Sequence, residues 1–223
     1  MQHVRAGIEA AIAGLPMERR RPVTLVAVSK AKSVADIRDA FAAGQREFGE
    51  NYVQEALAKM EATADLRPQG MTWHFIGPLQ SNKAKAVAQN FDWMHSIDRM
   101  KIAQALSGHR LGLPPLNICV QVNVSGESGK SGVAPAEAVT LARQIAVLPA
   151  LRLRGLMTII ENTPEESAQR RQFRMMQQLF DTVNRSGLAI DVLSMGMSHD
   201  YGVAISEGAT MVRLGSAIFG VRK

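Results

Sequence analysis

The chain has one cysteine, Cys119, among its 223 residues. An intrachain disulfide is therefore impossible, and a metal site built from several thiolates is excluded. Cys119 lies within the apolar run 116–124, so we expect it to be a buried structural thiol. Scarce cysteine is typical of a reducing compartment, and we expect a cytoplasmic protein.

Long apolar runs are also missing. No stretch approaches the roughly 20 apolar residues of a membrane span. Glu9 interrupts the only apolar stretch near the amino terminus, and residues 2–14 are typical of an amphipathic helix rather than a signal peptide. We therefore expect no association with a membrane.

Aromatic residues are few, and the five histidines show no metal-ligand spacing. No aromatic residue interleaves with the one basic run, Arg19-Arg20-Arg21, so a solvated loop is a better interpretation than a nucleic-acid site. We expect neither a metal site nor a nucleic-acid partner. The formal net charge of +6 suits small anionic ligands, including phosphates.

What is present is an alternation of strand-like and helix-like segments without a linker or a change in composition. Helical patterns separate eight apolar or β-rich runs, at residues 23–29, 46–50, 72–77, 91–97, 116–124, 153–159, 190–195 and 210–214. Eight strands, each followed by a helix or by the chain end, are the number that closes a parallel barrel. We predict a single (β/α)8 TIM barrel over residues 1–223, with an extra amino-terminal helix. A doubly wound open sheet is the alternative, but no Gly-rich dinucleotide turn follows the first strand.

The first strand-like run is apolar on both faces and ends in Lys30. An ammonium placed against a protein core has to be paired, change its pKa or be used covalently. Desolvation makes a lysine a better nucleophile toward aldehydes. Lys30 is therefore a candidate for a covalent linkage, although a lysine that reaches solvent from the strand end fits the same pattern.

The loops after the last two strands predict a phosphate site. Such loops often bind phosphate in barrels, through backbone N–H groups at a helix amino terminus. Gly215 permits close approach of the backbone, while Ser198 and Ser216 supply hydroxyl groups. Ser198 is also suited to cap a helix running through Ala209, and both roles can coexist. Arg213 alternates with apolar neighbours, so it faces either the barrel interior or the outer helices.

Three further segments are open to more than one interpretation. Asn51 could bind a ligand or cap the following helix, and His74, between aromatic neighbours, is typical of a core histidine with satisfied hydrogen bonds. The segment 126–132 resembles a P-loop but lacks the first glycine, which should stand at Val124. We interpret it as a mobile loop that could close over a ligand.

Six segments carry a more specific pattern. They are residues 26–30 (VAVSK), 48–55 (FGENYVQE), 73–83 (WHFIGPLQSNK), 155–157 (GLM), 194–198 (SMGMS) and 213–220 (RLGSAIFG). Together they closely resemble the pyridoxal phosphate homeostasis protein family, once called proline synthetase co-transcribed homologues. The resemblance extends from about residue 4 to residue 222.

This resemblance implies a barrel like the N-terminal domain of alanine racemase, with pyridoxal 5′-phosphate (PLP) held as a Schiff base on Lys30. By the same match, Ser198, Gly215 and Ser216 would hold the phosphate, and Arg213 would face the pyridine nitrogen. His199 stands where relatives often have an acidic or small polar residue. Family members are described as carriers or regulators of vitamin B6 and amino-acid pools, without an established catalytic turnover. The implied partners are PLP and apo-enzymes that use PLP, and we expect a monomer.

Two alternatives remain open. The first is a PLP-dependent racemase or decarboxylase with weak activity. An arginine at the ring nitrogen weakens the electron sink, although alanine racemase works with one. Alanine racemase also takes its second base from a C-terminal domain that we do not expect in a chain ending at Lys223. The second is a cofactor-free lyase that forms a Schiff base with a phosphorylated sugar. Near-visible absorbance after addition of PLP distinguishes PLP binding from the lyase.

Overall fold

The computed structural model describes residues 1–127 and 129–220, and in this part of the chain parallel strands close into a barrel in sequence order. The strands are β1 (Thr24–Val28), β2 (Glu47–Glu50), β3 (Thr72–Phe75), β4 (Trp93–Ile97), β5 (Leu116–Gln121), β6 (Leu151–Met157), β7 (Val192–Ser194) and β8 (Met211–Leu214). Pairing of β1 with β8 closes the ring, with Val26 opposite Arg213. The predicted TIM barrel is confirmed. Of the predicted domain 1–223, residues 128 and 221–223 lie outside the described residues.

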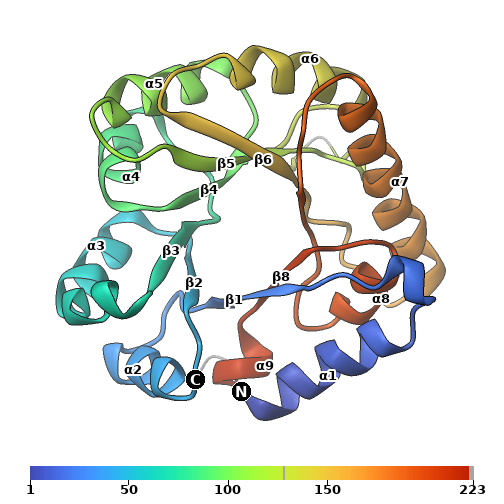
Figure 1. The fold of residues 1–223 in the computed structure, drawn as a ribbon, viewed down its shortest axis with the longest axis horizontal. Helices are drawn as coiled ribbons and strands as arrows, with labels where there is room; N and C mark the ends of the chain where they lie inside the picture. The colour runs from blue at the N-terminus through green and yellow to red at the C-terminus, as the bar shows by residue number, and fades with distance from the viewer. Residues whose placement is uncertain (128, 221–223) are drawn as a thin grey trace.

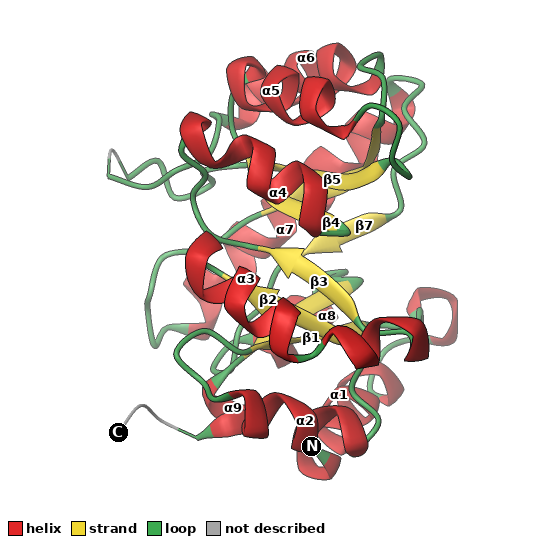
Figure 2. Ribbon diagram, turned by 90° about the vertical axis from the view of Figure 1, so that its left-hand side faces the viewer, coloured by secondary structure: helices red, strands yellow, loops and turns green. Residues whose placement is uncertain are grey.

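Helices surround the strands (Figure 1), and in the perpendicular view the strands lie between them (Figure 2). The α-helices are α1 (Gln2–Ala13), α2 (Val34–Ala42), α3 (Val53–Ala62), α4 (Ala84–Asn90), α5 (Met100–Arg110), α6 (Pro135–Ala146), α7 (Glu166–Arg185), α8 (Tyr201–Ser206) and α9 (Ser216–Phe219). The 3-10 helices are η1 (Met17–Arg19), η2 (Ala64–Gln69) and η3 (Ser81–Lys83). Among the described helices, none has both the length and the apolar character needed to cross a bilayer.

The extra amino-terminal helix α1 packs beside α8 on the outside of the barrel (Figure 1). Val4 and Ile8 are its buried residues. A Cβ atom at Gly7 would collide with the hydroxyl group of Tyr201 in α8. The absence of a side chain at this position therefore allows the two helices to approach closely.

Two predicted boundaries are corrected. The apolar run 116–124 is longer than the strand it contains, because β5 ends at Gln121. The next residue, Val122, instead forms an isolated bridge with Val133. The helix expected to run from Ser198 through Ala209 is shorter and begins at Tyr201, with Asp200 at its N-cap position.

Side chains from several strands form an apolar layer in the barrel interior. Cys119 belongs to the apolar layer, together with Val26, Trp93, Met157, Val192 and Met211. Burial raises the pKa of the Cys119 thiol to about 12, so the thiol stays protonated and unreactive. The expectation of a buried structural thiol is confirmed.

Candidate functional site

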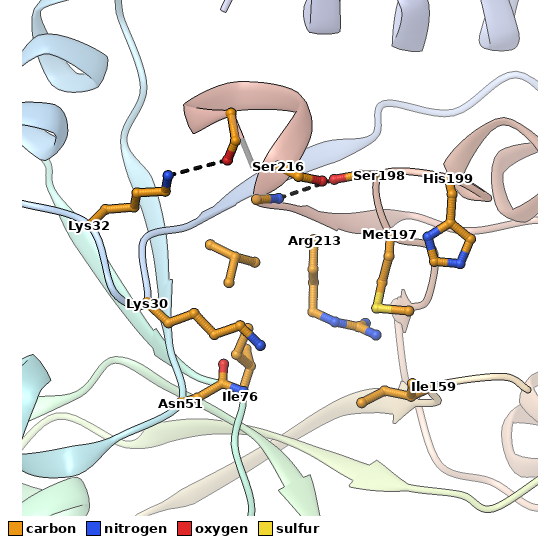
Figure 3. Close-up of a pocket in the computed structure, with 13 residues that line it drawn as sticks. Lys30, Lys32, Asn51, Ile76, Ile159, Met197, Ser198, His199, Arg213 and Ser216 are labelled. Atoms are coloured by element: carbon orange, nitrogen blue, oxygen red, sulfur yellow. Dashed lines mark hydrogen bonds between the residues drawn. The ribbon is translucent and has the colours of Figure 1, made fainter. Parts of the chain in front are cut away.

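A cavity of about 290 Å³ opens where β1 and β8 end, at the carboxyl face of the barrel (Figure 3). Active sites of TIM barrels form at this face because the βα loops meet there. The residues that line the cavity include every candidate site residue from the sequence: Lys30, Asn51, Ser198, Arg213, Gly215 and Ser216.

Lys30 lies in a turn two residues after the end of β1, and its side chain extends into the cavity (Figure 3). It is partly buried, whereas the preceding Ser29 is fully buried. The next residue, Ala31, has a φ of 58°, in the left-handed region that side chains with a Cβ rarely adopt. The turn that presents Lys30 is therefore strained and needs support from neighbouring elements.

That support comes from Lys59 of α3, which the sequence interpretation missed. Its Nζ donates to the Ser29 carbonyl oxygen at 2.7 Å and to Glu50 Oε1 at 2.8 Å. Lys59 also pairs with Glu55 at 2.5 Å, and Glu55 accepts the backbone N–H of Ala31 at 2.6 Å. One network centred on the buried Lys59 thus holds the residues on both sides of Lys30.

A signal for Lys59 was present in the sequence. It shares the buried face of α3 with Val53, Ala56 and Met60, at helical spacing. A lysine on such a face has to find a buried partner. Burial raises the pKa of that partner, Glu50, although the hydrogen bonds from Lys59 and Ser29 oppose the rise.

Arg213 of β8 faces the barrel interior, which settles the alternative left open by its strand phase. Only 4% of its surface is exposed, and burial lowers its pKa to about 10. One terminal nitrogen donates to Ser194 Oγ at 2.7 Å and the other to the Thr158 carbonyl oxygen at 2.9 Å. These two bonds use two of the five N–H groups of the guanidinium, so further N–H groups remain to donate to a ligand in the cavity.

Ser198 does not cap α8. Its Oγ instead accepts the backbone N–H groups of Gly215 and Ala217, each at 3.3 Å, so it bridges the two loops predicted to hold phosphate. Asp200 holds the turn that carries Ser198, because its Oδ1 accepts the backbone N–H of Met197. Ser216 is the first residue of α9, where backbone N–H groups lack partners within the helix.

Asn51 follows β2 and does not cap α3, whose N-cap position is Tyr52 without a side-chain hydrogen bond. The Asn51 Oδ1 atom is buried and accepts no hydrogen bond from the described residues. The Asn51 backbone packs directly against Gly77, and a Cβ at residue 77 would collide with it. A buried acceptor without a partner in a cavity wall indicates a missing donor.

The segment 126–132 lies in the loop after β5, and Ser128 within it lies outside the described residues. The Asn123 side chain accepts the backbone N–H of Gly126 at 3.1 Å and donates to the carbonyl oxygen of Glu127 at 2.9 Å. Ser131 lines a second cavity that shares Asn51 with the first. The segment is therefore close to the site, and its closure over a ligand stays a prediction.

Among the described residues, no three His, Cys, Asp or Glu side chains gather as a metal site would require. The titratable side chains in the cavity wall are instead Lys30, Lys32, His199 and Arg213. Lys32 donates to the Phe219 and Gly220 carbonyl oxygens at 3.0 and 3.2 Å. Cationic groups thus surround the cavity, together with hydroxyl groups and backbone amides, and this set is suited to an anion.

Comparison with known proteins shows the family of the chain. Residues 16–223 match the family model described as alanine racemase, N-terminal domain. The pyridoxal phosphate homeostasis protein of Pseudomonas aeruginosa is 55% identical over 206 residues, which cover 91% of this chain and 87% of that protein.

PipY of Synechococcus elongatus PCC7942, solved without PLP, is 37% identical with a TM-score of 0.85, covering 96% of this chain and 99% of that chain. The same protein with PLP bound gives 36% identity and a TM-score of 0.82 over the same shares. The chain belongs to the alanine racemase N-terminal domain family, in the group whose members are named pyridoxal phosphate homeostasis protein.

Proposed function

We propose that the protein binds PLP in the cavity as a Schiff base on Lys30 and acts in PLP homeostasis inside the cell. The observation that carries this proposal is one cavity that holds a lysine, a buried arginine and the paired loops around Ser198 and Gly215. PLP has an aldehyde, a ring nitrogen and a phosphate. The cavity offers a matching group for each.

The donor set fits PLP in detail. Ser198, Gly215 and Ser216 would hold the phosphate, because their hydroxyl and backbone N–H groups are typical phosphate donors. The buried and unpartnered Oδ1 of Asn51 would accept a hydrogen bond from a hydroxyl-bearing ligand. A Cβ at Gly215 would lie 3.3 Å from the Val28 carbonyl oxygen, so glycine keeps this wall close to β1.

Lys30 would attack the PLP aldehyde carbon through its neutral Nζ, with a C=N bond formed and water released. The network around Lys59 holds the lysine turn during this step. Hydrolysis of that C=N bond would return the lysine amine and free PLP, so one linkage would allow both binding and release.

We infer that the site serves storage rather than catalysis. PLP supplies an electron sink whose strength depends on protonation of its ring nitrogen. Arg213 remains positively charged near neutral pH even with its pKa at about 10, so it would donate a hydrogen bond to that nitrogen and keep it unprotonated. A weak sink suits a carrier that binds and releases PLP.

The test is addition of PLP to the purified protein, followed by borohydride reduction and peptide mapping. We expect near-visible absorbance and an adduct on Lys30, with both lost in Lys30→Ala. Lys32→Ala is the matched control, because Lys32 lines the same cavity but donates to the Phe219 and Gly220 carbonyl oxygens. An adduct on Lys83 or Lys130, or no uptake of PLP, would overturn the proposal.

A PLP-dependent racemase or decarboxylase is the competing function. Deuterium exchange at the Cα atom of an amino acid, abolished by Lys30→Ala, would establish it. A cofactor-free lyase would take up no PLP. For the carrier, we expect a cytoplasmic monomer that transfers PLP to an apo-enzyme, measured as recovery of that enzyme's activity with a Lys30→Ala control.

A further inference from the structure

A continuous chain of hydrogen bonds crosses the barrel interior below Arg213. Arg213 donates to Ser194 Oγ at 2.7 Å, and Ser194 Oγ lies 3.0 Å from His95 Nδ1. His95 Nε2 lies 2.9 Å from His74 Nδ1, and His74 Nε2 lies 2.6 Å from Glu47 Oε2. The chain thus joins the cavity to a carboxylate at the start of β2, the opposite end of that strand from the cavity.

The chemistry of each member fixes the direction in which the chain donates. Ser194 Oγ accepts from Arg213, so its single hydroxyl proton is available to His95 Nδ1. His95 then carries its proton on Nε2 and donates it to His74 Nδ1. His74 in turn carries its proton on Nε2 and donates to the Glu47 carboxylate. Every proton points away from the cavity.

The opposite direction is unfavourable. It requires either a protonated Glu47 that donates to His74 or a second proton on the fully buried His74, and it ends with His95 donating to Ser194 Oγ. Ser194 would then receive two N–H groups, from His95 and Arg213, and its hydroxyl proton would need another acceptor. An unsatisfied polar group at this depth costs about 1–3 kcal/mol.

Packing keeps both imidazoles in place. His74 and His95 are fully buried, and the His74 ring stacks on Trp93 at 5.4 Å between ring centroids, with an interplanar angle of 11°. Burial, with His74 and Arg213 nearby, lowers the pKa of His95 well below its usual value. A neutral His95 with one fixed proton can accept on Nδ1 and donate on Nε2 at the same time.

We propose that this chain of hydrogen bonds positions the Arg213 guanidinium beneath the cavity and holds each histidine in a single tautomer. The positioning residues are Glu47, His74, His95 and Ser194. The chain leaves Arg213 as a fixed donor toward a ring nitrogen acceptor in the ligand. The identity of that ligand rests on the proposed function, whereas the tautomers are a property of the protein alone.

The first test is long-range ¹H–¹⁵N correlation NMR of the ligand-free protein. We expect both histidines as Nε2–H tautomers, assigned with His74→Gln and His95→Gln. Glu47→Leu should mix the tautomers of His74, whereas Glu47→Gln should keep them because its amide oxygen still accepts. Nδ1–H tautomers, or an unchanged His74 in Glu47→Leu, would overturn the chain, whether or not the protein binds PLP.

The second test measures the affinity for PLP and for a deaza analogue in which a C–H group replaces the ring nitrogen. In Ser194→Ala and His95→Leu, we expect PLP to bind about tenfold more weakly, as for loss of one well-placed hydrogen bond. Binding of the analogue should change little, because it has no acceptor for Arg213. His95→Gln, whose amide can accept and donate, should restore part of the PLP affinity. Equal losses for both ligands would show a purely structural role, and unchanged PLP affinity would show no role.

Discussion

Lys59 shows how a single residue outside the cavity positions another inside it. The Lys59 side chain is 7% exposed, and its ammonium contacts Glu50, Glu55 and the Ser29 carbonyl oxygen. Taking this charge out of water is unfavourable, and the hydrogen bonds offset the cost only while every partner is present. The strained Ala31 turn that follows Lys30 depends on the same network.

We predict that Lys59→Ala lowers the free energy of unfolding by about 3–5 kcal/mol, because Glu50 is left buried without its counter-ion. The measurement is urea unfolding. The double variant Lys59→Met, Glu50→Leu is the control and should lose less, since no uncompensated charge remains. A single variant as stable as the parent protein would contradict this account.

At the scale of elements, strand β4 carries a pH-sensitive side chain, His95, into the barrel interior. His95 in β4 is fully buried, and burial keeps its folded-state pKa well below the usual 6.5. Below pH 6.5 the unfolded chain therefore binds a proton that the folded protein does not. Stability contributed by neutral His95 is lost as the pH falls through this value.

We predict that the free energy of unfolding decreases on acidification by up to about 1.4 kcal/mol per pH unit through His95 alone. In His95→Gln that component is absent, so the variant should show a shallower slope between about pH 6.5 and about pH 5. Urea unfolding at a series of pH values gives both slopes. Parallel slopes would mean that His95 titrates normally in the folded protein.

At the scale of the whole molecule, the net charge of +6 acts on ligands before they reach the cavity. The cavity wall adds Lys30, Lys32 and Arg213 at the carboxyl face. A positive field of this kind concentrates anions at the cavity mouth and speeds their association. Salt weakens such a field, because it shortens the screening length from about 30 Å at 0.01 M to about 3 Å at 1 M.

We predict that PLP associates about tenfold more slowly at the higher of these salt concentrations, at the lower limit of electrostatic steering effects. Stopped-flow absorbance measures the rate. Pyridoxal, which lacks the phosphate, is the control and should show little dependence on salt. An equal salt effect on both aldehydes would argue against steering by charge.

The sequence by itself determined the barrel, because eight short apolar or β-rich runs alternate with helical patterns, as parallel strands with helical crossovers do. It also determined the candidate residues, since parallel strands bring their carboxyl ends to one face. Lys30, Ser198 and Gly215 are far apart in the chain, yet all line the cavity.

The tertiary structure alone decided three matters. Strand alternation left Arg213 facing inward or outward, and closure of β8 onto β1 placed it inside. Ser198 was predicted to supply a hydroxyl group to a phosphate site and was also suited to cap a helix, but its Oγ accepts the Gly215 and Ala217 N–H groups, which lie beside it only in the folded protein. The His74–His95 chain joins separate strands. Local periodicity carries no information about such contacts, because they depend on which strands face one another across the barrel.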